Sequence, residues 1–178
     1  LAAVWQRGDV ALSNLSLSSG PARAEAEGDV AYGAELNFWQ TRLRMHFIAF
    51  DPKVWLPWPE KWLGENSLQG AVDVDLASNW KTRARIQLKD SKLTGVRVAG
   101  DVAWDAPREV MSWQTDLDVG GNRLIADGKL PWRVGADGRP HLAGSQAWQA
   151  QLDGRHLEAL GPMLEADRKS TRLNSSHQ

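Results

Sequence analysis

The chain has 178 residues, a formal net charge of −1 and no cysteine. The balanced charge gives no global electrostatic attraction for nucleic acid, so we expect no such partner, and the missing thiols exclude a disulfide framework and a thiolate metal site. No run reaches the roughly 18 apolar residues of a bilayer span, and the start lacks the pattern of a signal peptide. We therefore expect any export signal or membrane anchor to lie outside this sequence.

From residue 22 onward, apolar and polar residues alternate with the period of two that indicates a β-strand with unlike faces. In the first such run Ala22, Ala24 and Ala26 lie on one face, and Arg23 and Glu25 lie on the other. A slip of one residue would turn the apolar set to water, so the alternation specifies the register. The same pattern predicts strands over 22–32, 72–76, 83–89, 96–104, 113–119, 124–130 and 148–152.

Turn-forming residues separate these runs, at 19–21, 90–91, 105–107, 120–122 and 136–140. Breaks this short leave no room for crossover helices, so neighbouring strands are expected to pair antiparallel. Helix is indicated only at 59–64, where Pro59 suits the first helical position, and after Gly154, with a break at Gly161-Pro162. We predict an all-β fold: an elongated, curled antiparallel β-sheet that forms a groove, with one or two short helices.

The phrase Gly-Asp-Val-Ala begins at Gly8, Gly28 and Gly100, and each copy ends next to a bulky apolar residue. In each copy we expect Gly and Val to share a face with that bulky residue, while Asp points away. The separations between the copies are unequal, which disfavours a solenoid of fixed period. The repeat favours a long sheet extended by adding hairpins.

The predicted apolar faces contain many Ala and Gly beside Val, Leu and Ile. Small residues contribute little buried area, whereas a sandwich core about 10 Å thick normally uses larger side chains. A sheet curled around a groove would instead present a smooth apolar lining to a mobile ligand such as an acyl chain. The pattern alone leaves both the sandwich or barrel interior and the open groove as interpretations.

Several short motifs, in this order, resemble the TamB family (translocation and assembly module) of AsmA-like proteins of Gram-negative bacteria. The first is Phe50-Asp51-Pro52 with Val54-Trp55 and Pro57, followed by Leu68-Gln69-Gly70. The others are "IQLKDSKLTGVRVAGDVAW", "GGNRLIADGKL" and "WQAQLDGRHLEALGPML". The resemblance covers roughly residues 1–165 and lacks the family's N-terminal anchor and C-terminal domain, so the chain resembles an internal fragment.

The resemblance implies a periplasmic groove, anchored to the inner membrane in the full-length protein, that conducts phospholipid toward the outer membrane. It also implies support of outer-membrane protein and autotransporter assembly beside an Omp85-type barrel partner (TamA-like). Membrane contact would be made by parts of the full-length protein that are absent here, and no cofactor is implied. The expected lining is Val72, Val74, Leu76, Ala84, Ile86, Leu88, Val96, Val98, Val102, Trp104, Leu117 and Val119.

Catalytic and metal-binding patterns are missing from the sequence, so we expect no enzyme and no metal site. The four histidines are far apart, and the sequence has no nucleophile elbow, phosphate-binding loop or HExxH motif. Asp73 and Asp75 share a strand face, as a catalytic carboxylate pair would. Arg83 and Arg85 can oppose them on the next strand, so we interpret the set as cross-strand ion pairs on a solvated face.

The ten tryptophans permit a rival function, a glycan-binding sandwich or solenoid that stacks exposed rings on sugars. Trp104, Trp113 and Trp148 are predicted to lie on apolar strand faces, and Trp39 to face outward. A further cluster, Trp55, Trp58 and Trp62, is expected to pack under its loop. A purely structural β-spacer is the third possibility.

The polar tail 167–178 breaks the pattern and resembles translated adapter or vector sequence, with an ordinary disordered terminus as the alternative. We assign 1–166 to the β-groove segment and leave the tail out of the fold prediction.

Overall fold

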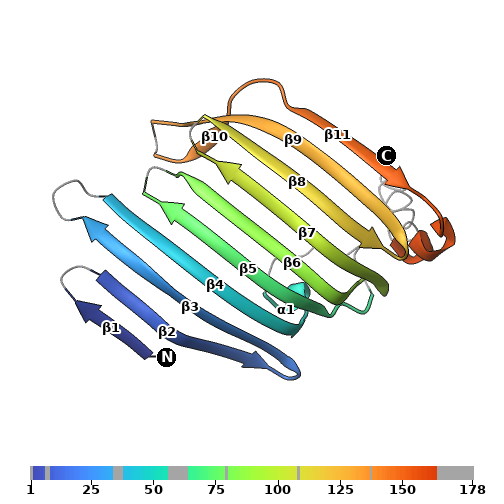
Figure 1. Ribbon diagram of the computed structural model, residues 1–178, viewed down its shortest axis with the longest axis horizontal. Coiled ribbons are helices and arrows are strands. Elements are labelled where there is room, and N and C mark those ends of the chain that lie inside the picture. Colours follow the sequence, from blue (N-terminus) through green and yellow to red (C-terminus); the bar gives the residue numbers. More distant parts are fainter. Residues whose placement is uncertain are drawn as a thin grey trace, which may run out of the picture.

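The computed structural model describes residues 2–6, 9–33, 38–55, 64–78, 80–107, 109–136 and 138–163. Its strands form one antiparallel, unclosed sheet in which β1 to β10 follow chain order and β11 also pairs with β9 (Figure 1). The predicted all-β, elongated antiparallel sheet is confirmed. Neither short helix among the described residues has the length and apolar character of a membrane span. The elements are β1 (Ala2–Gln6), β2 (Asp9–Ser19), β3 (Ala22–Gly33), β4 (Phe38–Phe50), α1 (Pro52–Trp55), β5 (Leu68–Ala77), β6 (Thr82–Leu93), β7 (Val96–Ala106), β8 (Val110–Val119), β9 (Asn122–Val134), β10 (Pro140–Leu142), β11 (Ala147–Asp153) and η1 (Leu157–Leu160).

Two local predictions need correction. The turn predicted at 90–91 lies inside β6, where the register shifts between Leu88 and Ser91. The turn itself is formed by Thr94 and Gly95, both with positive φ. The side chain of Ser91 hydrogen-bonds both backbone groups of Gln69 on β5, at 2.9 and 3.0 Å, and this holds the irregular segment in the sheet.

The helices also differ in detail from the prediction. Most of the helix expected at 59–64 lies outside the described residues, and the described residues contain a helix at α1 that was not predicted. There Pro52 occupies the first helical position, and the Asp51 carboxylate accepts a hydrogen bond from Lys53 N at 3.0 Å, as an N-cap does. Helix after Gly154 is confirmed as η1, but helical backbone continues through 161–163 rather than breaking at Gly161.

The strand register aligns apolar side chains in rows across the sheet. One row runs from Leu43 through Val74, Ala84 and Trp104 to Trp113. Because successive side chains of a strand alternate, the parallel rows on either side continue the same face. We call this surface the apolar face; on β3 to β9 it includes Ala24, Ala26, Gly28, Val30, Thr41, Leu43, Met45, Phe47, Gly70, Val72, Val74, Leu76, Ala84, Ile86, Leu88, Val98, Gly100, Val102, Trp104, Trp113, Thr115, Leu117, Val119, Leu124, Ala126 and Gly128.

Glycines stand where the sheet bends, which accounts for two copies of the repeated phrase. Each pairs with the residue after which the neighbouring strand bulges: Gly28 with Leu12 of β2, Gly70 with Phe47 of β4, and Gly100 with Leu88 of β6. A Cβ at any of these glycines would overlap a carbonyl oxygen of an adjacent strand. A bulge adds local twist and bend to the sheet. Glycine, which has no side chain, lets the next strand approach closely at that bend.

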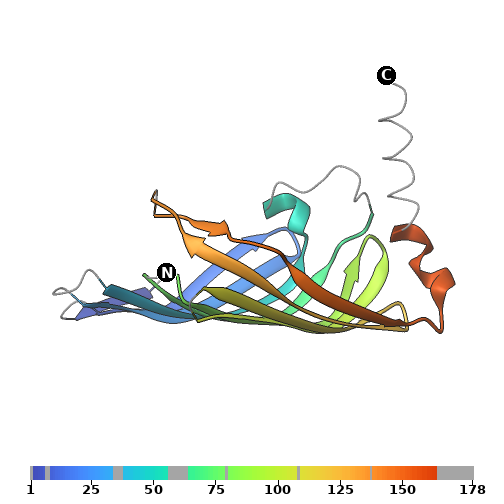
Figure 2. The same cartoon turned by 90° about the horizontal axis from the view of Figure 1, so that it is seen from above.

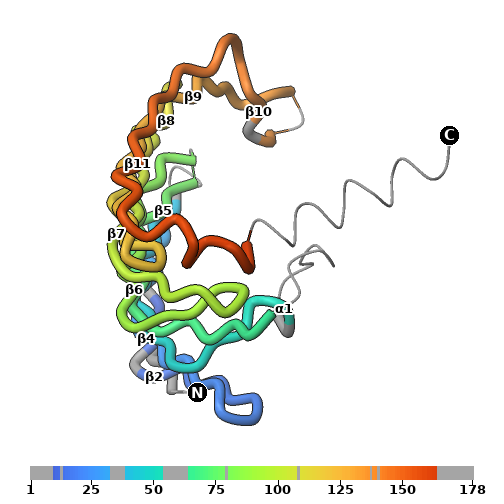
Figure 3. The backbone as a smooth tube through the Cα atoms, turned by 90° about the vertical axis from the view of Figure 1, so that its right-hand side faces the viewer, coloured from blue at the N-terminus to red at the C-terminus, as the bar shows by residue number. Residues whose placement is uncertain are grey.

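Beyond these bulges the hairpins turn toward one side of the sheet. Figure 2 shows the ends of the β2–β3 and β6–β7 hairpins rising on the side that carries α1 and η1, and Figure 3 shows the same ends and α1 on the concave side. A Cβ added at Gly120 would contact both Ala159 of η1 and Val96 of the apolar face. Therefore η1 lies on the apolar side of the sheet. The concave side of the curled sheet is therefore its apolar face.

Ion pairs between neighbouring strands cover the opposite, polar face. Asp73 and Asp75 oppose Arg85 and Arg83 in register, as predicted. Their ion pairs nevertheless run to β4: Arg44 Nε lies 2.9 Å from Asp73 Oδ1, and Arg42 Nε lies 3.0 Å from Asp75 Oδ1. The β6 arginines reach β7 instead, toward Asp101 and Asp105. These side chains are substantially exposed, so the solvated ion-pair interpretation holds with different partners.

Candidate functional site: the concave apolar face

All twelve residues of the predicted lining lie on the apolar side of β5 to β8. Nine are half-buried: Val72, Val74, Leu76, Ile86, Leu88, Val102, Trp104, Leu117 and Val119. The other three are covered, with exposed fractions of 2% for Ala84 and 4% each for Val96 and Val98. Register brings the nine together, since Val72 pairs with Ile86 and Ile86 with Val102. Reasoning by face could not reveal the three buried positions, because burial depends on the neighbours in the next row.

Small residues form low points on the apolar face. Ala26 and Gly28 lie between larger side chains of the neighbouring strands β2 and β4. Among the described residues no second sheet packs on this face, and the helices on this side are the short α1 and η1. A sheet normally buries its apolar face against another layer, so a large part of this surface stays open to an apolar ligand.

The η1 end of the apolar face is fastened by a buried asparagine. Asn122 has an exposed fraction of 0%. Its Nδ2 donates to His156 O at 2.8 Å and to Val119 O at 3.1 Å, and its Oδ1 accepts from His156 N at 2.8 Å. Sequence analysis placed Asn122 in a turn only, because the contact with residue 156 spans the whole of β9 to β11.

At the opposite strand ends a hydrogen bond joins two turns that are far apart in the sequence. The indole Nε1 of Trp80, after β5, donates to Gly138 O, between β9 and β10, at 2.9 Å. The backbone at Trp80 has a positive φ of 63°, so the chain turns sharply at the residue that makes this contact. The intervening strands β6 to β9 are thus bridged along one end of the sheet. No local sequence signal indicates a bond between residues so far apart.

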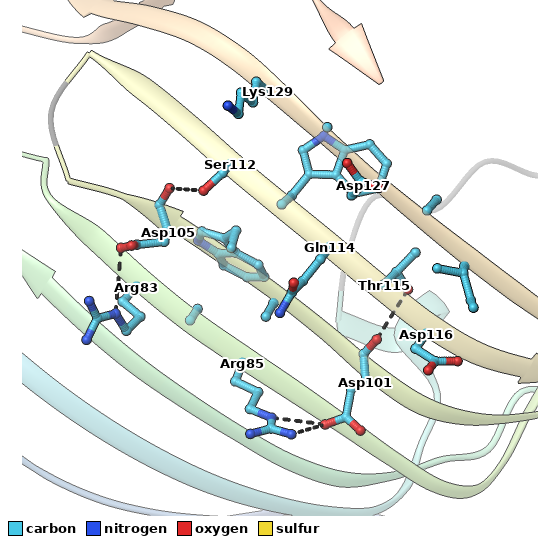
Figure 4. A pocket seen from close by; sticks show the side chains of 17 residues that line it. Arg83, Arg85, Asp101, Asp105, Ser112, Gln114, Thr115, Asp116, Asp127 and Lys129 are labelled. Carbon is cyan, nitrogen blue, oxygen red and sulfur yellow. Dashed lines mark hydrogen bonds and ion pairs between the residues drawn. The ribbon is translucent and has the colours of Figure 1, made fainter. Parts of the chain in front are cut away.

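A hollow on the described surface lies over the polar face. It has a volume of about 850 Å³ and is bordered by β6 to β9 (Figure 4). Most of its lining residues are polar-face positions, among them Arg85, Asp101, Gln114 and Asp127, and of the predicted lining only Ala84 and Trp104 border it. The hollow therefore does not coincide with the predicted site.

Several charges around this hollow are paired within the protein. Arg85 lies 3.0 Å from Asp101, and Arg123 lies 2.7 Å from Asp116. The hydrogen bond from Arg123 lowers the pKa of the Asp116 carboxyl, and the same bond raises the pKa of Arg123. Carboxylates that are already paired in this way do not offer a cation an open set of ligands. No group of His, Asp and Glu suited to a metal ion occurs among the described residues.

The tryptophans are distributed differently from the prediction at one position. Trp39 lies on the apolar face and not on the outer one, because it shares parity with Thr41 and Leu43 and pairs with Tyr32. Trp104 and Trp113 are neighbours on the apolar face, as predicted. Trp148 continues that face on β11 with an exposed fraction of 68%. The Trp55, Trp58 and Trp62 side chains lie outside the described part of the chain.

Comparisons of the chain with protein-family models, with curated proteins and with solved structures give no match.

Proposed function

We propose that this sheet is a section of a TamB-like, AsmA-like periplasmic groove whose concave apolar face carries phospholipid acyl chains. The observation that supports the proposal most is a single curled sheet with an apolar concave face that no second layer of the described chain covers. Its nine half-buried lining residues lie side by side across β5 to β8. A soluble protein does not normally leave such a surface to water.

An acyl chain suits this surface in energy and in shape. Each CH₂ group removed from water contributes about 0.8 kcal/mol, so a chain lying along the strands gains stabilisation from many weak contacts without a specific pocket. The half-buried glycines Gly28, Gly70 and Gly100 leave room for the chain, and the larger residues around them limit its sideways movement. The polar face, with its internally paired charges, remains in water.

The wider role rests on the resemblance of the sequence motifs. In this role the full-length protein is anchored in the inner membrane, conducts phospholipid between the inner and outer membranes, and supports outer-membrane protein assembly with an Omp85-type partner. The section described here forms one part of the groove in this role. Its task is to keep acyl chains out of water along its part of the route.

Adjacent residues on β7 provide a matched test. Val102→Asp places a charge on the apolar face, whereas Ala103→Asp places the same charge on the polar face, where Arg85 is its register partner. We expect the first variant to lose crosslinking to a phospholipid with a photoreactive acyl chain, and the second to retain it. Ile86→Asp, at the register partner of Val102, should behave like Val102→Asp. Val98 is too buried for this purpose, since a charge there would disturb folding.

Circular dichroism and urea denaturation serve as folding controls for each variant. Equal crosslinking of Val102→Asp and Ala103→Asp would contradict the proposal. Quenching of tryptophan fluorescence by soluble glycans, without phospholipid in the purified protein, would support the glycan-binding alternative in its place.

A further inference from the structure

The strand β11 ends the sheet with an unprotected edge. It pairs with β9 alone among the described residues, and all seven of its residues are exposed. Natural sheets usually protect such edges with Lys, Pro or a bulge. The sequence of β11, "AWQAQLD", contains no Lys or Pro, and its pairing with β9 runs without a register shift. This edge is therefore competent to accept another strand.

Hydrogen bonds of β9 show which of its backbone groups face which neighbour. Trp132 N donates to Glu109 O at 2.7 Å on the β8 side, and Ala143 N donates to Pro131 O at 2.8 Å on the opposite side. Backbone groups alternate in direction along a strand, and the register of β8 with β9 is continuous. The even-numbered residues of β9 thus face β8, and the odd-numbered residues face β11.

The same alternation identifies the free groups of β11. Gln149 and Gln151 pair with odd-numbered residues of β9, so their N–H and C=O groups point into the sheet. The N–H and C=O groups of Trp148, Ala150 and Leu152 consequently point outward from the open edge. Among the described residues no strand pairs with these groups, so they are available to another strand.

The edge is complementary to itself in the antiparallel direction. With Ala150 opposite the partner's Ala150, Trp148 lies opposite the partner's Leu152, and all the outward backbone groups pair. Gln149 then lies opposite the partner's Gln151 on the polar face, where the two amides can hydrogen-bond. Asp153 faces the partner's Ala147, so no like charges meet. Apolar residues meet apolar residues and amides meet amides, which is the pattern that stabilises antiparallel pairs.

We propose that two copies of this chain associate through β11, antiparallel and centred on Ala150, around a two-fold axis normal to the sheet. Both apolar faces then lie on the same side, and the rows that end at Trp148, Ala150 and Leu152 continue into the partner. Pairing depends on the edge alone. Only its consequence, an acyl-chain surface of doubled length, rests on the proposed function.

The chain mass in solution tests the pairing. The full chain should sediment at twice its mass of 19.7 kDa. Ala150→Pro removes an outward N–H that β9 does not use, so it should leave the sheet intact while raising the dimer dissociation constant by on the order of tenfold or more. Ala150→Ser keeps this N–H and should remain dimeric. Far-UV circular dichroism checks that both variants are folded.

A cysteine placed at the two-fold axis tests the register without a folding ambiguity, since the chain has no cysteine of its own. Directly opposed residues have Cα atoms about 5.5 Å apart, within disulfide range. Ala150→Cys should form an interchain disulfide on mild oxidation, whereas Ser112→Cys, exposed on β8 and paired with β7 and β9 on its two sides, should not. A monomeric wild-type chain, an unchanged dimer in Ala150→Pro, or equal crosslinking of the two cysteine variants would overturn the proposal. None of these results depends on lipid.

Discussion

Gly100→Ala tests the physical role of the glycine that faces the β6 bulge. Gly100 has a φ of +130°, and an added Cβ would overlap the carbonyl oxygen of Asp116 and lie 2.9 Å from Leu117 Cα. Backbone strain of this kind costs about 1–3 kcal/mol, and an overlap that no rotamer change relieves costs about another 1–3 kcal/mol. We therefore expect Gly100→Ala to lower the free energy of unfolding by about 2–6 kcal/mol.

Substitutions of two other glycines distinguish the cost of backbone strain from the cost of overlap with a neighbouring strand. Gly20 has a φ of +58° and open space around its added Cβ, so Gly20→Ala should cost only about 1 kcal/mol of strain. Gly28 lacks the positive φ but would overlap the carbonyl oxygen of Arg42, so Gly28→Ala should fall between the two. Urea denaturation followed by circular dichroism measures all three. A loss for Gly100→Ala no larger than that for Gly20→Ala would refute the role assigned to the bulge.

Two further predictions concern side chains around the site. Asn122→Ala should lower the free energy of unfolding by about 2–4 kcal/mol, because it removes the buried hydrogen bonds to the backbone of His156 beside η1. Amide hydrogen exchange should then become faster over residues 154–163, and unchanged exchange there would contradict this role. Arg123→Gln should raise the pKa of Asp116 toward its ordinary value, measured by NMR titration. Because folding lowers the pKa of Asp116, the ion pair with Arg123 adds a small stabilisation that is present at neutral pH and is lost as pH falls through the folded pKa. An unchanged pKa of Asp116 in the variant would show that Arg123 does not cause the shift.

Alternation along the chain was sufficient to predict seven of the described strands and their faces, whereas β1, β2, β4 and β10 were not predicted. The period of two placed Val72, Ile86 and Val102 on one surface, and the structure aligns them in one row. The outward prediction for Trp39 failed because it departed from this rule: its parity with Leu43 places it on the apolar face. Where alternation was applied consistently, the face was correct.

Features that depend on distant partners could not be predicted. The repeated Gly-Asp-Val-Ala phrase favoured a long sheet extended by hairpins, but the reason for its glycine lies in a bulge on the preceding strand, at Leu88 for Gly100. Each aspartate of β5 has an arginine on both neighbouring strands, and side-chain direction, which register does not determine, selected Arg44 over Arg85 for Asp73. The Trp80–Gly138 bond depends on two turns that meet only in the folded sheet.

The most direct test of the acyl-chain surface is a crosslinking scan along β7. A photoreactive amino acid is placed in turn at positions 101, 102, 103 and 104 of the purified protein in phospholipid, and the attached lipid is detected by mass. Side chains at 102 and 104 project from the apolar face, and those at 101 and 103 project from the polar face. The account predicts phospholipid adducts at 102 and 104 only. Adducts of equal yield at all four positions, or none at 102 and 104, would contradict it.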